Sequence, residues 1–157
     1  MDLKMRNQDN RVVVITGDGE LNEGTVWESL LVANALGLDN LTLLVDRNQF
    51  QANVRTEELI PLEPLEDKFK AFGCRVNRIN GHDFQQIADA LNGVRHAGDG
   101  KVNVIIADTV RGKGLPSIEA RANRWFCSFT EQEAGELIQE LHGHAEASLQ
   151  SESLIVR

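Results

Sequence analysis

Two short apolar segments, each followed at once by polar residues, constrain the fold of this chain more than any other feature. Residues 12–16 (VVVIT) lead into the sequence GDGE, and residues 41–45 (LTLLV) lead into DRNQ. Asp18 and Asn48 therefore lie thirty positions apart, each just beyond an apolar run. A strand, a crossover helix and a return strand take roughly 30 residues, so this spacing predicts two neighbouring parallel strands.

The polar residues at the ends of these strands predict a binding site. In open α/β sheets ligands bind at the carboxyl ends of the strands, where Asp18 and Asn48 are expected to meet. A carboxylate, an amide oxygen and backbone carbonyls are hard oxygen ligands that suit a Mg²⁺ ion bound to phosphate. Gly17 and Gly19 would let backbone N–H groups approach phosphate oxygens closely. The pattern indicates a chain that holds a phosphorylated cofactor; the alternative for Asp18 alone is a helix-capping carboxylate without a metal.

The spacing of apolar residues in the rest of the chain supports the same kind of parallel sheet. Apolar strand segments alternate with helical ones, which predicts an α/β fold with an open parallel sheet and helices on both faces. The strand at 12–16 is continuously apolar and should be buried on both faces, and the helix after it should have Asn22 as N-cap and Gly37 as C′ residue. Residues 1–142 then form one diphosphate- and Mg-binding domain, with a polar tail at 143–157. Expected strands cover 12–16, 41–45, 74–79 and 102–107, and expected helices cover 23–36, 66–72, 84–95 and 131–141.

The composition excludes several classes of protein. With 24 acidic and 16 basic residues among 157, the net charge is -8, which argues against a nucleic-acid partner because phosphate backbones require clustered Lys and Arg. No apolar stretch is long enough for a signal peptide or a membrane span. Cys74 and Cys127 lack the spacing of a zinc site, so we expect reduced thiols and a cytoplasmic protein.

A series of short motifs runs in a fixed order through the chain. GDGE at residue 17 is followed by DRNQFQ at residue 46, GHD at residue 81 and TVRGKG at residue 109. This series resembles the thiamine-diphosphate-binding motif and its surroundings in the N-terminal subunit of two-chain transketolases. The likeness runs from the first residues to about residue 140.

The resemblance implies a set of site residues. Asp18 and Asn48 would be side-chain ligands of Mg²⁺, the backbone carbonyl of Phe50 would be the third protein ligand, and diphosphate oxygens and water would complete an octahedron. Thiamine diphosphate would then be contacted by Gly17, Asp18, Gly19, Glu20, Asn48, Phe50 and Lys113. A solvated loop residue is the alternative for Lys113, and His82 and Asp83 are expected to cap the helix that follows them.

The resemblance also implies an activity and its partners. In this family the cofactor transfers a two-carbon ketol unit from a ketose to an aldehyde, and a glutamate on a separate pyrimidine-binding domain activates it. This chain ends before any such domain, so the resemblance implies a partner chain of the transketolase C-terminal type. No catalytic residue is therefore assigned within these residues.

The chain departs from the family pattern in two places. Residues 1–6 resemble the second half of a helix that precedes the first strand in the family, so the fold is expected to be incomplete at the N-terminus. The sequence would then be a fragment, or a further chain would supply the missing layer, and exposed apolar surface would favour association. Trp125-Phe126 stands where the family usually has Trp-His, and a phenyl ring cannot donate a hydrogen bond to a sugar. This favours a changed substrate, for example a carrier-bound one. Two alternatives stay open: a decarboxylase or acyl-transferring enzyme, and a non-catalytic remnant that binds a partner.

Overall fold

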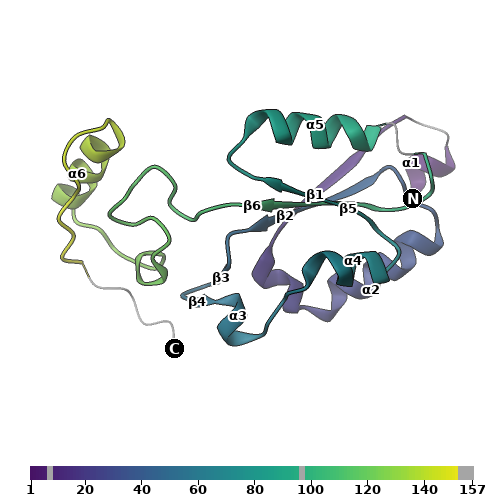
Figure 1. Cartoon of the computed structure of the whole chain (residues 1–157), viewed down its shortest axis with the longest axis horizontal. Coiled ribbons are helices and arrows are strands. Elements are labelled where there is room, and N and C mark those ends of the chain that lie inside the picture. Colours follow the sequence, from purple (N-terminus) through teal and green to yellow (C-terminus); the bar gives the residue numbers. More distant parts are fainter. Residues whose placement is uncertain (7–8, 96–97, 152–157) are drawn as a thin grey trace.

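Four parallel strands form the central sheet of the chain. The computed structural model describes residues 1–6, 9–95 and 98–151. Within this part the strand order is β1-β2-β6-β5, and every neighbouring pair runs parallel, as the sequence predicts (Figure 1). The strands are β1 (Val12–Gly17), β2 (Leu41–Arg47), β5 (Arg75–Asn80) and β6 (Asn103–Asp108).

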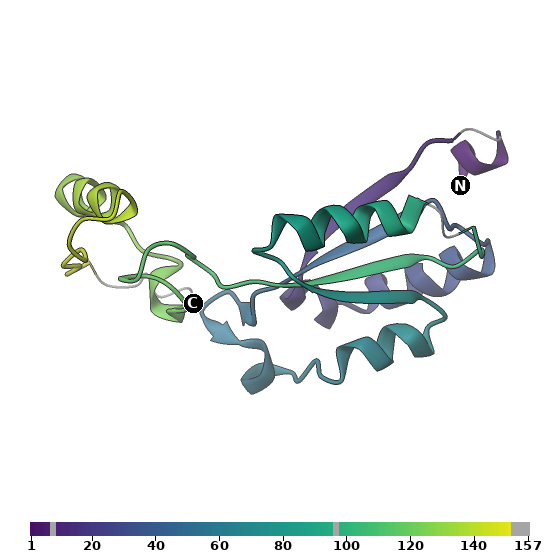
Figure 2. The same ribbon diagram turned by 45° about the horizontal axis from the view of Figure 1, so that its top comes forward.

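Helices cover both faces of this sheet. Figure 1 shows α5 on one face and α2 and α4 on the other, and Figure 2 shows the same layers after rotation. A two-stranded antiparallel hairpin follows β2. These elements, with the remaining short ones, are α1 (Asp2–Met5), η1 (Asp18–Asn22), α2 (Gly24–Ala35), β3 (Phe50–Gln51), β4 (Val54–Arg55), α3 (Thr56–Leu59), α4 (Leu65–Ala71), α5 (Phe84–Arg95), η2 (Ala122–Arg124) and α6 (Glu131–Leu141). None of the described helices is both long and apolar enough to cross a membrane.

Two apolar clusters hold the layers together. The larger one lies between the sheet and helices α2 and α4, where Phe69 is fully buried and stacks on Trp27 with 4.9 Å between ring centroids. The smaller one lies under α5, where Ile79 and Ile105 pack against Ala90. Burial of side chains of this size contributes about 1.5–3 kcal/mol each. The rigid sheet that positions the candidate site rests on these two clusters.

Strand β1 differs from the prediction that it is buried on both faces. It forms one edge of the sheet, and Val12, Val13, Val14 and Ile15 are between 40% and 70% exposed. On one face an open hollow of about 360 Å³ separates this strand from the start of α2, and on the other face α5 packs over β5 and β6 instead. The prediction is wrong because an apolar run indicates that a strand is to be buried, but it does not indicate whether the same chain or another polypeptide buries it.

The two ends of α2 give one correction and one confirmation. Asn22 is not the N-cap; this position falls on Glu23, because the tight turn of η1 takes up residues 18–22 and directs the Asn22 amide to Gln51 Oε1 at 2.7 Å. Gly37 follows the helix with a φ of +61°, the left-handed conformation expected of a C′ glycine.

The segment after β6 leaves the sheet and ends in α6, which Figure 1 shows apart from the two helical layers. Thr130 and Glu133 form a capping box at its start. Residues 144–151 then fold back along α6, since Gln150 N and Ser151 N donate to Glu133 Oε1 at 2.7 and 2.8 Å. Of the predicted polar tail, residues 152–157 lie outside the described residues, and a domain boundary at residue 142 stays a prediction.

The exposed edge predicts that the isolated chain associates with itself. Val13→Thr combined with Ile15→Thr keeps the β-branched shape of both residues while it removes apolar surface, so we expect a smaller associated fraction in sedimentation velocity. Unfolding free energy should change by less than about 0.5 kcal/mol per site because both side chains are exposed. Ile60→Thr, at a residue 53% exposed elsewhere, is the control. Equal association of all three proteins would contradict the prediction.

The hydrogen bonds that Glu133 accepts predict that residues 150–151 detach from α6 in acid. Bonds from Ser151 and Thr130 hold the pKa of Glu133 well below its ordinary value of 4.5, so its contribution to stability is present above pH 4.5 and is lost as the pH falls through the lowered pKa. Hydrogen exchange at Gln150 and Ser151, corrected for intrinsic rates, should accelerate in acid, and at pH 7 in Glu133→Gln. Glu131→Gln, in the same turn, should leave it unchanged; protection that survives in Glu133→Gln would refute this role.

Candidate functional site

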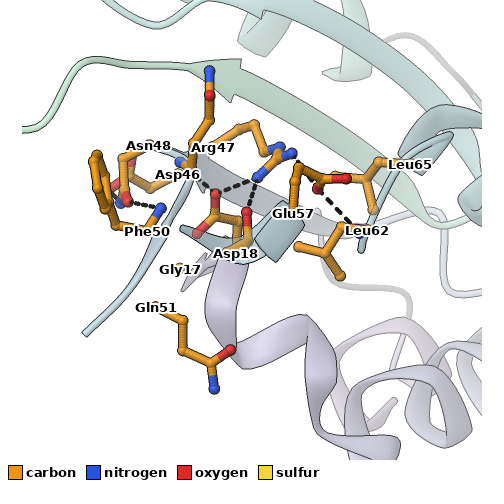
Figure 3. Close-up of polar contacts among 12 residues, drawn as sticks. Gly17, Asp18, Asp46, Arg47, Asn48, Phe50, Gln51, Glu57, Leu62 and Leu65 are labelled. Carbon is orange, nitrogen blue, oxygen red and sulfur yellow. Dashed lines mark hydrogen bonds and ion pairs between the residues drawn. The ribbon is translucent and has the colours of Figure 1, made fainter. Parts of the chain in front are cut away.

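The sheet brings the two predicted strand ends together. Strands β1 and β2 are neighbours, and Gly17 pairs with Asp46 in their register. Asp18 and Asn48, which follow these paired residues, therefore lie at the same carboxyl edge, as the sequence predicts (Figure 3). Loops after β5 and β6 reach the same edge, since Val110 N donates to His82 Nε2 at 2.7 Å. Loops that follow all four strands thus lie at one sheet edge.

Asp18 is fully buried, and within the described part of the chain only one of its carboxylate oxygens has a hydrogen-bond partner. Oδ2 accepts hydrogen bonds from Arg47 Nη1 at 2.8 Å and from Gln49 N at 2.6 Å. Oδ1 is buried and has no hydrogen-bond partner among the described residues. Burial raises the pKa of Asp18 above its ordinary value, although the bonds from Arg47 and Gln49 oppose the rise. A buried carboxylate with one unsatisfied oxygen is a position that suits a cation.

The backbone is strained where it meets this carboxylate. Gln49 has a φ of +70°, an uncommon conformation for a residue other than glycine. In this conformation its N–H points at Asp18 Oδ2. Such strain costs on the order of 1–3 kcal/mol and concentrates at functional sites. The Gln49 backbone therefore helps to fix which oxygen of Asp18 remains without a partner.

Asn48 is oriented so that its amide oxygen faces the loop of Phe50. Its Nδ2 donates to Asp46 Oδ2 at 2.9 Å, and its Oδ1 accepts from Phe50 N at 3.0 Å. The Thr109 hydroxyl donates to the other oxygen of Asp46. Arg111 Nη2 lies 3.5 Å from Asn48 Oδ1 and 3.3 Å from the Phe50 carbonyl oxygen. One positively charged group therefore contacts two of the three predicted metal ligands.

Arg47 connects Asp18 to a larger ionic network. It is only 2% exposed, donates to Thr56 Oγ1 at 2.7 Å, and forms ion pairs with Glu57 at 2.8 Å and Glu63 at 3.3 Å. Figure 3 shows its guanidinium between Asp18 on one side and Glu57 on the other. Removal of one partner from such a buried network costs far more than the pair itself contributes, because it leaves a charge uncompensated. Arg47 thus fixes the position of the Asp18 carboxylate.

The glycine loop packs closely and leaves little space for side chains. A Cβ on Gly19 would lie 2.9 Å from two side-chain atoms of Gln51, so the hairpin and this turn can approach only because residue 19 is glycine. Gly17 N donates to Glu20 Oε2 at 2.7 Å. Glycine at position 19 is thus required by packing, and the cofactor contacts predicted for Gly17, Gly19 and Glu20 stay a prediction.

Lys113 and the 81–83 loop lie outside the cluster around Asp18. Lys113 Nζ is 3.4 Å from Glu119 Oε1, and its side chain is 54% exposed. Asp83 caps α5, as predicted, because its Oδ1 accepts from Gln85 N at 2.9 Å. His82 instead joins two loops through its bond with Val110. A Cβ on Gly81 would lie 2.5 Å from Thr109, so these loops approach closely only at a glycine.

Asp46, Arg47 and Arg111 are charged residues next to the predicted ligands for which the sequence motifs predict no role. Residues alternate between the two faces of a strand, so Asp46 and Asn48 share one side while Arg47 points to the other. A charged residue within a buried strand requires a charged partner, so the sequence did indicate that Arg47 would form an ion pair. No comparable signal exists for Arg111, whose contacts lie about sixty positions away along the chain.

The donor set fits a hard divalent cation. Asp18 Oδ1, Asn48 Oδ1 and the Phe50 carbonyl oxygen are the ligand types that Mg²⁺ prefers. No group of three or more His, Cys, Asp or Glu side chains that could hold a metal occurs within the described ranges. A metal at this edge would therefore be held by one carboxylate, one amide and one backbone carbonyl, with the remaining ligands supplied by other molecules.

Comparison with known families decides between the possible kinds of phosphate-binding domain. Residues 4–150 match the family model described as transketolase, thiamine diphosphate binding domain. The chain belongs to the transketolase family. Family membership agrees with the position of Asp18 and Asn48 at one sheet edge.

Relatives with known names extend this finding. The chain is 37% identical over 130 residues to the 6-deoxy-6-sulfo-D-fructose transketolase subunit SqwG of Clostridium sp. (strain MSTE9), a match that covers 83% of this chain and 47% of the relative. It is 37% identical over 118 residues to an apulose-4-phosphate transketolase subunit of Actinobacillus succinogenes, covering 75% of this chain and 42% of that protein. The chain thus spans about half the length of these relatives.

A solved transketolase has the same fold. The transketolase of Campylobacter jejuni superposes with a TM-score of 0.68 at 31% sequence identity, covering 73% of this chain and 18% of that one. The parallel sheet and its helices are therefore those of the transketolase N-terminal domain.

The Arg47 network predicts a stability effect that can be measured directly. Arg47→Met should cost about 3–5 kcal/mol of unfolding free energy in urea, because it leaves the buried Asp18 carboxylate without its ion pair. Arg78→Met is the matched control: Arg78, like Arg47, forms ion pairs with three acidic side chains, here Asp108, Glu63 and Glu66, but it is 29% exposed and its loss should cost less than about 1 kcal/mol. Adding Asp18→Asn should restore part of the loss in Arg47→Met. Equal costs for the two arginines would refute this account.

Proposed function

We propose that this chain is a subunit of a thiamine-diphosphate-dependent, transketolase-like transferase that moves a two-carbon ketol unit. The family match to a thiamine-diphosphate-binding domain supports the cofactor, and relatives named as transketolase subunits support the activity. The observation that carries the proposal is the buried Oδ1 of Asp18, which lacks a protein partner among the described residues. A magnesium ion held to the diphosphate would satisfy it.

The residues of the sheet edge would act by holding and orienting. Asp18, Asn48 and the Phe50 carbonyl would bind Mg²⁺, and Arg47 would keep the Asp18 carboxylate turned toward it. The glycine loop with Gly17, Gly19 and Glu20 would surround the diphosphate, and Lys113 would contact cofactor or substrate anions after leaving Glu119. Thiamine diphosphate supplies the carbanion chemistry when it is bound.

The proposal includes partner chains. A transketolase C-terminal-type chain with the pyrimidine-binding domain would supply the activating glutamate at a shared interface. The exposed apolar side chains of β1 support a further layer of polypeptide outside these 157 residues. Assembly in the cytoplasm would keep Cys74 and Cys127 as thiols, and no disulfide joins them in the structure.

The relatives and one departure from the family pattern support a proposal for the substrate class. The named relatives act on 6-deoxy-6-sulfo-D-fructose and apulose-4-phosphate, which supports a ketose-type substrate. Phe126 is 36% exposed beside Trp125 and offers no hydrogen bond to a sugar hydroxyl. This observation favours an altered or carrier-bound substrate, and it keeps acyl transfer or decarboxylation as the second candidate activity.

Calorimetric titration tests the proposal. The chain mixed with its partner should bind thiamine diphosphate only when Mg²⁺ is present, and Asp18→Ala should reduce the affinity by at least about 100-fold, because it removes the charged metal ligand. Asp67→Ala, which removes an exposed carboxylate on α4, should have no effect. Metal-independent binding, or equal binding by both variants, would refute the metal site; absence of binding in the complete complex would favour a non-catalytic remnant.

A further inference from the structure

Arg111 occupies the space in front of the proposed metal ligands. Its Nη2 contacts Asn48 Oδ1 at 3.5 Å and the Phe50 carbonyl oxygen at 3.3 Å, and its Nη1 donates to the Ala52 carbonyl at 2.7 Å. We propose that Arg111 and the divalent cation compete for the same oxygens, so that metal binding displaces this guanidinium from the site. The inference rests on the proposed function, because it takes these oxygens as metal ligands.

The charges around Arg111 are those that would attract a metal. Burial lowers the pKa of Arg111, and the negative charges of Asp18 and Asp46 oppose this lowering. Arg111 therefore lies in the field of Asp18, the carboxylate that would hold Mg²⁺, and of Asp46. Its positive charge balances part of their negative charge, as a bound cation would.

The two cations cannot share this position. Mg²⁺ requires its ligands at 2.0–2.1 Å in an octahedral arrangement, whereas a guanidinium nitrogen stands more than an ångström farther from the same oxygens. Two positive charges a few ångströms apart also repel each other, and partial burial strengthens the repulsion. Metal binding thus requires Arg111 to release Asn48 and Phe50.

The surroundings of Arg111 make its displacement observable. The guanidinium lies between two aromatic rings, with its central carbon 4.7 Å from the Phe50 centroid and 4.3 Å from the Trp125 centroid. Trp125 belongs to the segment after β6 and is 54% exposed, whereas the other tryptophan, Trp27, is packed against Phe69. Movement of Arg111 would therefore change the environment of Trp125 specifically.

Metal titration of the full chain tests the competition. MnCl₂ is the probe, because Mn²⁺ accepts the same oxygen ligands and its free ion is counted by electron paramagnetic resonance. Arg111→Gln should bind Mn²⁺ about tenfold or more tightly than the wild type, since the competing charge is gone. Arg55→Gln is the matched control: it removes a charge that lies over the same Phe50 ring, at 4.9 Å, and should change the affinity by less than about twofold. Asp18→Ala added to Arg111→Gln should abolish the gain.

Tryptophan fluorescence provides the second measurement. Mn²⁺ also quenches tryptophan emission, so diamagnetic MgCl₂ is used here. Addition of MgCl₂ to the wild type should shift Trp125 emission, and the shift should be absent in Arg111→Gln and in Trp125→Phe. Far-UV circular dichroism confirms that each variant is folded. Arg111→Lys, which keeps the charge but not the fork of donors, should lie between the wild type and Arg111→Gln in affinity.

The outcomes separate this inference from the proposed function. Unchanged or weaker Mn²⁺ binding by Arg111→Gln would overturn the competition, and it would instead make Arg111 a contributor to binding. If the partner complex still binds thiamine diphosphate with Mg²⁺ in that case, the proposed function stands. If neither the wild type nor Arg111→Gln binds metal and the complex binds no cofactor, both proposals fail.

Discussion

The buried ion pair between Arg47 and Asp18 is the interaction on which the arrangement of the site depends. A carboxylate with no solvent exposure stays in a folded protein only when its charge is compensated, and the network through Arg47 provides this compensation. The pair joins the end of β1 to the end of β2, and Glu57 and Glu63 extend it to the segment that leads into α4. The same bond engages Oδ2 of Asp18, while Oδ1 has no hydrogen-bond partner in the described ranges.

The sequence predicts the layers of this fold well, because its apolar periods are clear. The helix at 84–95 and the strand after it follow directly from the spacing of apolar residues, and the structure places them within a residue or two. The burial of β1 could not be predicted, because an apolar strand has the same composition whether its cover comes from this chain or from another. The N-cap role predicted for Asn22 is wrong for a local reason: a short 3₁₀ turn and α2 begin one after the other, and capping preferences do not distinguish them.

For the site, the sequence predicts the meeting of Asp18 and Asn48 but not the groups that orient them. Motif spacing along a strand–helix–strand unit determines where two strand ends lie, and this needs no knowledge of side-chain contacts. The roles of Arg47 and Arg111 depend on contacts between side chains 29 and 63 positions apart, which neither period nor spacing encodes. Lys113, the one basic residue given a cofactor role from the motif, lies against Glu119.

The position of β1 has a consequence for how cofactor loading and assembly depend on each other. Asp18 follows the carboxyl end of this strand, and no other strand among the described residues pairs with its outer edge. Any polypeptide that pairs with that edge therefore restrains the same backbone that presents the carboxylate to a ligand. Coupling between two binding events is reciprocal. If such pairing raises ligand affinity by a certain factor, ligand binding raises the affinity of pairing by the same factor. The assembled fraction of such a chain would then increase with the concentration of the cofactor.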